Sequence, residues 1–192
     1  MKKFLQNEVI VLRALEPDDI ELLYRWENDE EIWTVSHTIV PFSRHTLALY
    51  IQNSYQDIYE SKQLRMMIDT PLGKTAGAID LFDFDPFHGR AGLGILVHHP
   101  DDRSKGYATA ALNLMIRYCF EKLKLHQLYA NILTDNAESL KLFLKAGFVL
   151  SLGPEKSGFG KAIPGRMSIC CNWSISDFKD SGLRPFSNFQ IP

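Results

Sequence analysis

The sequence predicts an α/β domain in which strand-like and helix-like segments alternate over most of its 192 residues. Leu93 to Val97 is an uninterrupted apolar run of the kind found in buried strands. Leu128 to Thr134 alternates like a half-buried strand. Between these two segments, apolar residues recur at helical spacing: Ala108, Ala111, Leu112, Met115, Ile116, Cys119 and Leu123. The order strand, helix, strand indicates a sheet flanked by helices.

The remaining segments fit the same organisation. Val9 to Leu15 is expected to form the first strand, and Pro17 begins the first helix, where proline is tolerated. Ser43 is predicted as the N-cap of a second helix that runs to Tyr59. Three more strands are expected at Arg65 to Ile68, Thr75 to Phe84 and Arg166 to Trp173.

Composition indicates one domain, residues 1–180, followed by a tail at 181–192 that is rich in Pro, Ser and Asn. A net charge of −2 and a pI near 6.3 give no basic patch for nucleic acid. Three cysteines, two of them adjacent, make no disulfide framework and favour a cytoplasmic location. Neither a signal peptide nor an apolar run of the ~20 residues that span a membrane is apparent.

An anion site is predicted where the strand ending at Val97 leads into the helix that follows. A short loop with glycine before a helix directs unpaired backbone N–H groups and the positive end of the helix dipole at one point. Such a point suits a pyrophosphate. The loop matches neither a P-loop nor a dinucleotide-binding turn. By itself it is equally compatible with an ordinary connection between strand and helix. Its residues are Arg103, Ser104, Lys105, Gly106, Tyr107, Ala108 and Thr109.

A second motif lies one helix and one strand further on, at Asn136 to Phe148, with Asn136 as N-cap and Gly147 at the helix end. The two motifs resemble the Arg/Gln-x-x-Gly-x-Gly/Ala and Asn-x-x-Ser/Ala-x-x-Leu-Tyr/Phe-x-x-x-Gly-Phe signatures of the GNAT family of N-acetyltransferases, in the family's order. The pattern is most similar to the branch that acetylates spermidine and ribosomal-protein N-termini, which shares the segment Trp26 to Asp29.

This resemblance implies a mixed, mostly antiparallel, V-shaped sheet of six to seven strands. It implies acetyl-coenzyme A as the acetyl donor, no metal, and direct attack of a primary amine in a ternary complex. The pantetheine arm would enter between two splayed strands and pair with the backbone there. The residues implied in donor binding are Leu96, Val97, His98, the seven loop residues from Arg103 to Thr109, Asn136, Ser139 and Phe143.

Two positions depart from the family pattern. Gly92 stands where many relatives carry a glutamate that acts as general base, and Phe143 stands where a tyrosine commonly protonates the leaving thiolate. Asp80 or Asp83 is predicted as a replacement base; the alternative is that both are solvated surface carboxylates. Because their numbers differ by three, a regular strand cannot direct both to one face.

The acceptor is expected to be a small cationic amine such as a polyamine, or a protein N-terminus. Glu30 and Glu31, in an acidic run after the first helix, would attract it, and Trp33 would stack against it. A solvated helix end and a core tryptophan are the alternatives. Gly92 and Phe143 also leave open an acyl-coenzyme A sensor with little or no activity. A homodimer is left open, as is docking of a partner on the tail through Phe186 and Phe189.

Overall fold

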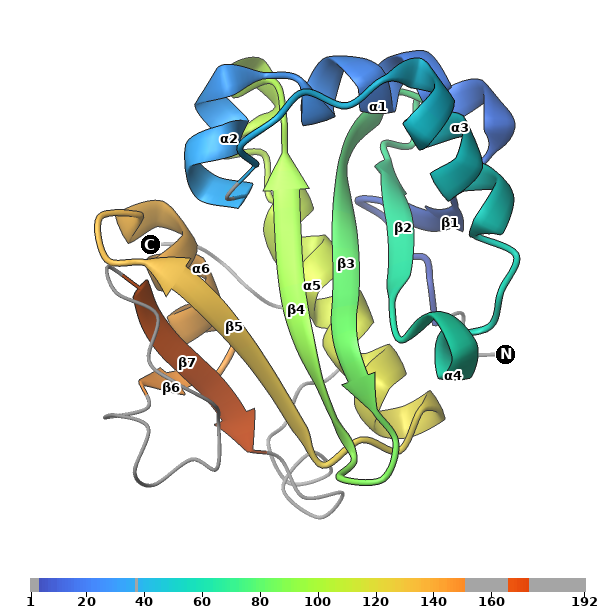
Figure 1. The fold of residues 1–192 in the computed structure, drawn as a ribbon. Helices are drawn as coiled ribbons and strands as arrows, with labels where there is room; N and C mark the ends of the chain where they lie inside the picture. Colours follow the sequence, from blue (N-terminus) through green and yellow to red (C-terminus); the bar gives the residue numbers. More distant parts are fainter. Residues whose placement is uncertain (1–3, 37, 151–165, 173–192) are drawn as a thin grey trace.

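A computed structural model describes residues 4–36, 38–150 and 166–172 (Figure 1). Within them, seven strands form one sheet in the order β1-β2-β3-β4-β5-β7-β6. Every neighbouring pair is antiparallel except β4 and β5, which are parallel. The predicted mixed, mostly antiparallel sheet is confirmed. The strands are β1 (Val11–Ala14), β2 (Leu64–Asp69), β3 (Thr75–Asp85), β4 (Arg90–Val97), β5 (Gln127–Leu133), β6 (Val149–Leu150) and β7 (Arg166–Asn172).

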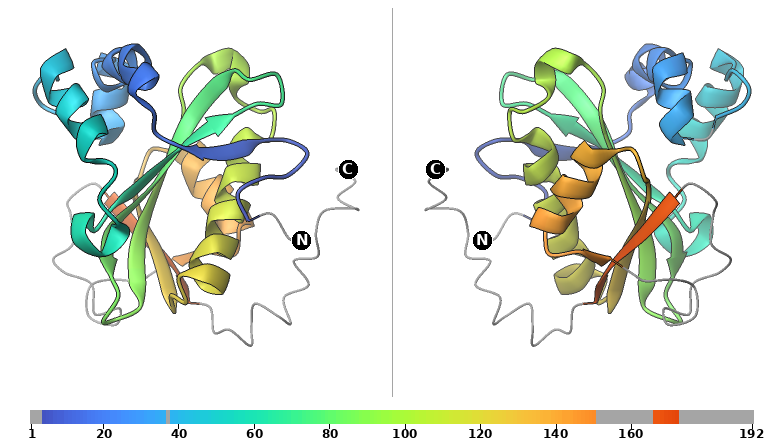
Figure 2. Two further views of the ribbon diagram at one scale, coloured as in Figure 1. Left: turned by 90° about the vertical axis from the view of Figure 1, so that its right-hand side faces the viewer. Right: turned by 90° about the vertical axis from the view of Figure 1, so that its left-hand side faces the viewer.

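Helices cover both faces of the sheet (Figure 2). One face carries the helices of the N-terminal third: α1 (Ile20–Glu27), α2 (Glu30–Ser36) and α3 (Arg44–Asn53). The other face carries α5 (Tyr107–Arg117), with a π-helical turn at Tyr118–Lys122, and α6 (Ala137–Lys145). In the part of the chain that the structure describes, no helix is long and apolar enough to span a bilayer.

Two apolar clusters hold these layers together. The larger one joins α5 to the strands through Ile79, Leu81 and Leu93, and the smaller one packs α1 and α3 on Met67 and Ala78. Neighbouring residues of β3 therefore belong to opposite clusters, as the alternation of a strand requires. Each fully buried aliphatic side chain contributes about 1.5–3 kcal/mol. Burial on both faces thus keeps the middle strands rigid, and these strands carry the site.

The sheet opens between β4 and β5. The two strands pair only at Arg90, Ala91 and Gly92 of β4 and then diverge toward their carboxyl ends (Figure 1). The last pair is Gly92 with Tyr129. The predicted V-shape is therefore present, and its apex lies at this pair.

Helix boundaries in the N-terminal third differ from expectation. The helix expected to run from Ser43 to Tyr59 ends at Asn53, and a short helix, α4 (Ile58–Ser61), follows. The break comes from Asp57, whose side chain accepts hydrogen bonds from the N–H groups of Tyr59 and Glu60 and so starts a new helix. The Ser43 cap itself is confirmed. Helix α2 was not anticipated, although Asp29 accepts a hydrogen bond from the Glu31 N–H at its start.

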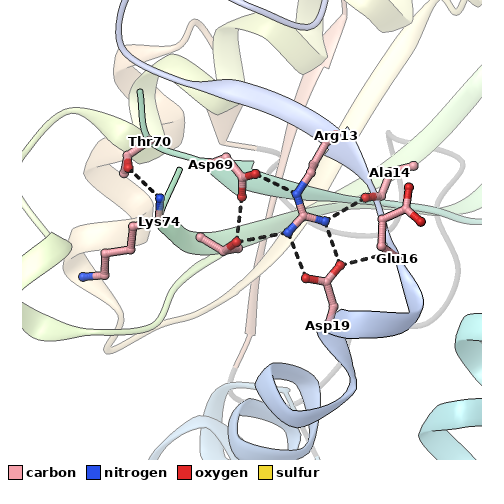
Figure 3. Close-up of polar contacts among 8 residues, drawn as sticks. Arg13, Ala14, Glu16, Asp19, Asp69, Thr70 and Lys74 are labelled. Carbon is pink, nitrogen blue, oxygen red and sulfur yellow. Dashed lines mark hydrogen bonds and ion pairs between the residues drawn. The ribbon is translucent and has the colours of Figure 1, made fainter. Parts of the chain in front are cut away.

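An ionic network fastens the edge strand β1 (Figure 3). The Arg13 guanidinium donates to both carboxylate oxygens of Asp19, at 2.7 and 2.8 Å, and to Asp69 at 2.6 Å. Asp19 ends the 3-10 turn Pro17–Asp19, which precedes α1, and is only 7% exposed. Burial alone would raise the pKa of Asp19, but hydrogen bonds from Arg13 and the Glu16 N–H outweigh it and lower this pKa below its ordinary value. The network thus ties β1, β2 and the start of α1 together.

Candidate active site

The loop after β4 presents backbone N–H groups to open space. Ser104 and Gly106 have left-handed φ values of 60° and 83°, so the chain turns sharply before α5 begins at Tyr107. No side chain caps this helix, and a Cβ added at Gly106 would meet nothing within 4 Å. The N–H groups of the first turn therefore lack a side-chain cap and lie at the positive end of the helix dipole. This geometry fits the predicted pyrophosphate site.

Charged side chains hold this loop in place. Asp102, 3% exposed, accepts hydrogen bonds from the ammonium groups of Lys74 at 2.5 Å and Lys105 at 3.4 Å. The hydrogen bond from Lys74 is the main reason why the pKa of Asp102 is lowered. Arg103 donates to the carbonyl oxygens of Val97 at 3.4 Å and His98 at 3.3 Å. The Arg103 guanidinium thus lies at the end of β4.

Along β4, the N–H and C=O groups of alternate residues point either at β3 or into the gap between β4 and β5. The His98 N–H donates to the Ala76 carbonyl on β3, so the alternation of an antiparallel ladder turns the peptide groups of Val97 toward the gap. The Leu96 carbonyl points at β3, since a Cβ on Gly77 would lie 1.9 Å from its oxygen. Among the predicted backbone partners of the pantetheine, Val97 therefore faces the gap and Leu96 does not. Ile95, which the sequence analysis missed, shares the orientation of Val97.

The predicted acceptor residues lie at the junction of α1 and α2. His98, just after β4, stacks on Trp26 with ring centroids 5.6 Å apart, and its Nε2 lies 3.0 Å from Asp29. Glu30 and Glu31 are exposed. The Trp33 indole donates to the Glu27 carbonyl at 2.7 Å. The acidic run is thus anchored beside the end of β4 (Figure 1).

The second motif caps and packs α6. The Asn136 side chain accepts a hydrogen bond from the Ser139 N–H at 3.0 Å, and Gly147 has a left-handed φ of 93° after the helix. Both predicted helix ends are confirmed. Phe143 is 3% exposed and meets Phe148 edge-on, with centroids 5.0 Å apart. Its ring belongs to the core, so a donor-binding role for Phe143 stays a prediction.

The absence of a side chain at Gly92 has a packing cause. A Cβ at this position would lie 2.1 Å from a ring carbon of Phe82, on the neighbouring strand β3. The Phe82 ring also meets Tyr129 edge-on, with centroids 5.8 Å apart. The ring of Phe82 thus occupies the space next to β4 that a glutamate at position 92 would need.

Asp80 is fully engaged by an arginine. The Arg65 guanidinium donates to one oxygen of Asp80 at 2.7 Å, to the other at 3.0 Å, and to Glu27 at 2.6 Å. Burial opposes the charge of Arg65, yet these carboxylates raise its pKa above the ordinary value. Arg65 and Asp80 line a cavity of about 170 Å³ between α3 and the sheet, together with Tyr50 and Phe82. A carboxylate paired in this way is poorly placed to accept a proton.

Asp83 lies on a β-bulge. The pairing of β3 with β4 shifts by one residue between Phe82 and Asp85, and Asp83 has a φ of 49°. Its carboxylate accepts a hydrogen bond from the Tyr129 hydroxyl at 2.9 Å. The strand is therefore not regular between Asp80 and Asp83, because the extra residue re-aims it, and the rule that a regular strand cannot direct both carboxylates to one face does not apply here. Burial and the bond to Asp83 raise the pKa of Tyr129, which stays a phenol at neutral pH.

Among residues 4–36, 38–150 and 166–172, no three His, Cys, Asp or Glu side chains gather closely enough to hold a metal ion. The expectation that the reaction needs no metal stays a prediction.

Comparison with known proteins gives a consistent result. Residues 10–149 match the model of a family described as an acetyltransferase (GNAT) domain. Spermidine N(1)-acetyltransferases of Vibrio cholerae and Escherichia coli K12 are 24% and 25% identical over 143 and 142 residues, which cover 74% and 72% of this chain and 80% and 72% of those proteins.

Two solved structures share the fold. A crystal structure of the V. cholerae spermidine N-acetyltransferase in complex with CoA and spermine has a TM-score of 0.73 at 21% identity, covering 86% of this chain and 96% of that one. A dodecameric structure of the enzyme from the same organism has a TM-score of 0.70 at 20% identity, covering 92% and 99%.

The uncapped start of α5, the gap between β4 and β5 and the family match over residues 10–149 agree with one another. The chain belongs to the GNAT family and is an N-acetyltransferase that moves an acetyl group from acetyl-coenzyme A to an amine.

Proposed function

We propose that this enzyme acetylates a primary amine of a small linear polyamine of the spermidine class. The observation that carries the proposal is the excess of carboxylates over cations around Arg65, near the apex. Asp80 and Glu27 share the single cation Arg65, which leaves an excess of negative charge, and Asp83 lies next to them along β3. Glu30 and Glu31 add exposed negative charge at the start of α2. A chain of ammonium groups complements such a surface.

The donor binds in our proposal along the gap. The N–H groups of Tyr107, Ala108 and Thr109 hold the pyrophosphate, with Ser104 and Lys105 beside them, and the arm runs along the edge of β4 at Ile95 and Val97. Asn136 and Ser139 lie across the gap at the start of α6. This arrangement delivers the thioester to the apex at Gly92 and Tyr129. Direct attack in a ternary complex follows, because Cys119, the one cysteine whose side chain the structure describes, is buried.

A thiol-release assay tests the acceptor. Acetyl-coenzyme A is held at saturation while spermidine, spermine and a peptide with a free N-terminus are each varied. We expect kcat/KM for the polyamines to exceed that for the peptide at least about tenfold, since electrostatic focusing favours the more highly charged acceptor. Turnover of the peptide with none of the polyamines would instead assign the enzyme to protein N-termini.

The alternative of an acyl-coenzyme A sensor rests on Gly92 and Phe143, and the structure uses both positions for packing. The family match assigns the chain to the N-acetyltransferases, so we expect thiol release with an amine acceptor. The homodimer and the cytoplasmic location also stay predictions; a dodecamer is known for the V. cholerae enzyme. The tail at 181–192 lies outside the described residues.

A further inference from the structure

The proton-transfer groups that the family pattern supplies are missing at both expected positions. Gly92 has no side chain, and the Phe82 ring fills the space beside it. Phe143 has no proton to give and is buried against Phe148. An amine with a pKa near 10 is protonated at neutral pH and must lose a proton before it attacks. Another group near the apex has to accept that proton.

Two carboxylates on β3 lie near the apex, and the structure separates them by their hydrogen bonds. Both oxygens of Asp80 accept from the Arg65 guanidinium. Asp83 is exposed, and only its Oδ2 accepts a bond, from the Tyr129 hydroxyl. Its Oδ1 has no hydrogen-bond partner among the described residues. Asp83 therefore keeps a lone pair available for a substrate proton.

Tyr129 links this carboxylate to the place where β4 and β5 part. It is the residue of β5 opposite Gly92, in the last pair before the strands diverge. Its ring stands edge-on to Phe82, which fixes the direction of the hydroxyl. The bulge at Asp83 turns the carboxylate back toward that hydroxyl. Bulges of this kind re-aim a side chain next to many active sites.

We propose that Asp83 is the proton acceptor of the reaction and that Tyr129 is the positioning residue that holds its carboxylate at the apex of the V. This inference rests on the proposed function, because it requires an amine acceptor on this face. Together the pair replaces the glutamate that Gly92 lacks. The Phe82 ring fills the space that a glutamate at position 92 would need, and its edge-on contact orients Tyr129.

The ammonium of the acceptor gives one proton to Asp83, and the freed nitrogen lone pair forms the C–N bond to the acetyl carbon. The C–S bond breaks, with its electron pair remaining on sulfur, and the surplus proton of the new amide nitrogen passes to that thiolate. Asp83 then returns its proton to water. Tyr129 remains a phenol throughout, in agreement with its raised pKa.

Other charged groups lie near Asp83 and Tyr129 and influence the pH dependence of the rate. Arg90 of β4 acts on Tyr129 and also lies 3.6 Å from Asp85. Asp85 is held in turn by His88, whose Nδ1 is 2.6 Å away. These groups stay intact in the variants used below. A change in the profile therefore reports on Asp83 and Tyr129.

The experiment compares Asp83→Asn and Tyr129→Phe with two matched exposed controls, Asp18→Asn and Tyr55→Phe. We expect Asp83→Asn to lower kcat at least about 100-fold, the usual size of a general-base effect. Tyr129→Phe keeps the ring and removes only the hydroxyl. Its kcat should fall about tenfold, with the acidic limb of the pH–rate profile displaced to higher pH. KM for acetyl-coenzyme A should stay within about twofold in both variants, and the controls should match wild type.

Full kcat in Asp83→Asn would overturn the proposal, and an unmoved pH profile in Tyr129→Phe would overturn the role of Tyr129. Circular dichroism and thermal melting establish that both variants fold, and Asp83→Glu, which retains the carboxylate, should recover part of the rate. If the wild-type enzyme acetylates the peptide and no polyamine, the proposal of a polyamine acceptor is wrong. The roles of Asp83 and Tyr129 are then tested with the peptide as acceptor. If the wild type acetylates no amine, both proposals fall.

Discussion

The proposed donor side and the proposed acceptor face of this enzyme are built in different ways. On the donor side, one continuous segment from β4 to α5 presents backbone N–H groups, and the left-handed Gly106 lets the chain turn into the helix. On the acceptor face, side chains from α1, α3, β2, β3 and β5 meet around Phe82 and Arg65. Backbone recognition tolerates side-chain change but not a change of chain path. Side-chain recognition is instead lost when a single side chain is changed. Substitutions should therefore affect donor binding and acceptor binding separately.

The largest effect is expected for Gly106→Val. A β-branched residue at a φ of 83° is strained, and its side chain would fill the space in front of the α5 N–H groups. We expect acetyl-coenzyme A affinity, measured by calorimetry, to fall at least about 100-fold, which corresponds to ~2.7 kcal/mol. Gly73→Val is the matched control, because Gly73 has a φ of 77° and equally open surroundings in the turn between β2 and β3. Unchanged affinity in Gly106→Val would remove this loop from the donor site.

The ionic network of Arg13 with Asp19 and Asp69 should affect the stability of the fold and leave donor and acceptor binding equally unchanged. Asp19→Asn leaves Arg13 without its main partner and should lower the free energy of unfolding by about 2–3 kcal/mol, at the lower end for broken buried pairs because Arg13 is partly exposed. Since the pKa of Asp19 is lowered in the folded state, its contribution is present above pH 3.8 and is lost as the pH falls below that value.

Urea unfolding across pH 2.5–7 measures this contribution of Asp19. The difference between wild type and Asp19→Asn should shrink toward the acid end. Asp18→Asn, one residue away and exposed, should show no such difference. A difference that stays constant with pH would mean that the Asp19 carboxylate contributes through packing alone.

The contact between Gly92 and Phe82 predicts a smaller change. Gly92→Ala places a methyl group 2.1 Å from the Phe82 ring and should cost about 1–3 kcal/mol, as overpacking does. Gly94→Ala, whose methyl group would lie 3.8 Å from the same ring, is the matched control and should change stability by less than about 0.5 kcal/mol. The double variant Gly92→Glu with Phe82→Ala should be more stable than Gly92→Glu alone. Equal stability of the two alanine variants would contradict the packing account.

The smallest effect is expected for the acidic rim. Replacing Glu30 and Glu31 by glutamine should raise KM for the polyamine about two- to fivefold and leave KM for acetyl-coenzyme A unchanged. The effect should fade as salt is added, because the screening length is only about 8 Å near physiological ionic strength. Glu60→Gln, an exposed change on α4, serves as control. Equal loss for both substrates, or no response to salt, would mark these residues as merely solvated.

Much of the donor side could be predicted from the sequence, because its determinants are local. Ser43, Asn136 and Gly147 cap helices whose first or last turns lie within three residues of them. The loop from Arg103 to Thr109 lies between a strand and a helix that neighbouring residues already indicate. Such features follow from hydrogen bonds and dihedral preferences inside one segment. The sequence therefore determined the fold class and the ends of these helices, and it located the loop that we propose for the donor.

Only the tertiary structure decided the acceptor face, because its contacts join residues far apart in the chain. Arg65 meets Glu27 and Asp80, and Tyr129 meets Asp83 across 46 positions. The bulge that re-aims Asp83 depends on the register between β3 and β4, which alternation along one strand cannot reveal. Gly92 likewise looks like a lost catalytic residue until the ring of Phe82 is found in its place. The positions of side chains that meet across strands depend on packing, and this packing exists only once the sheet has assembled.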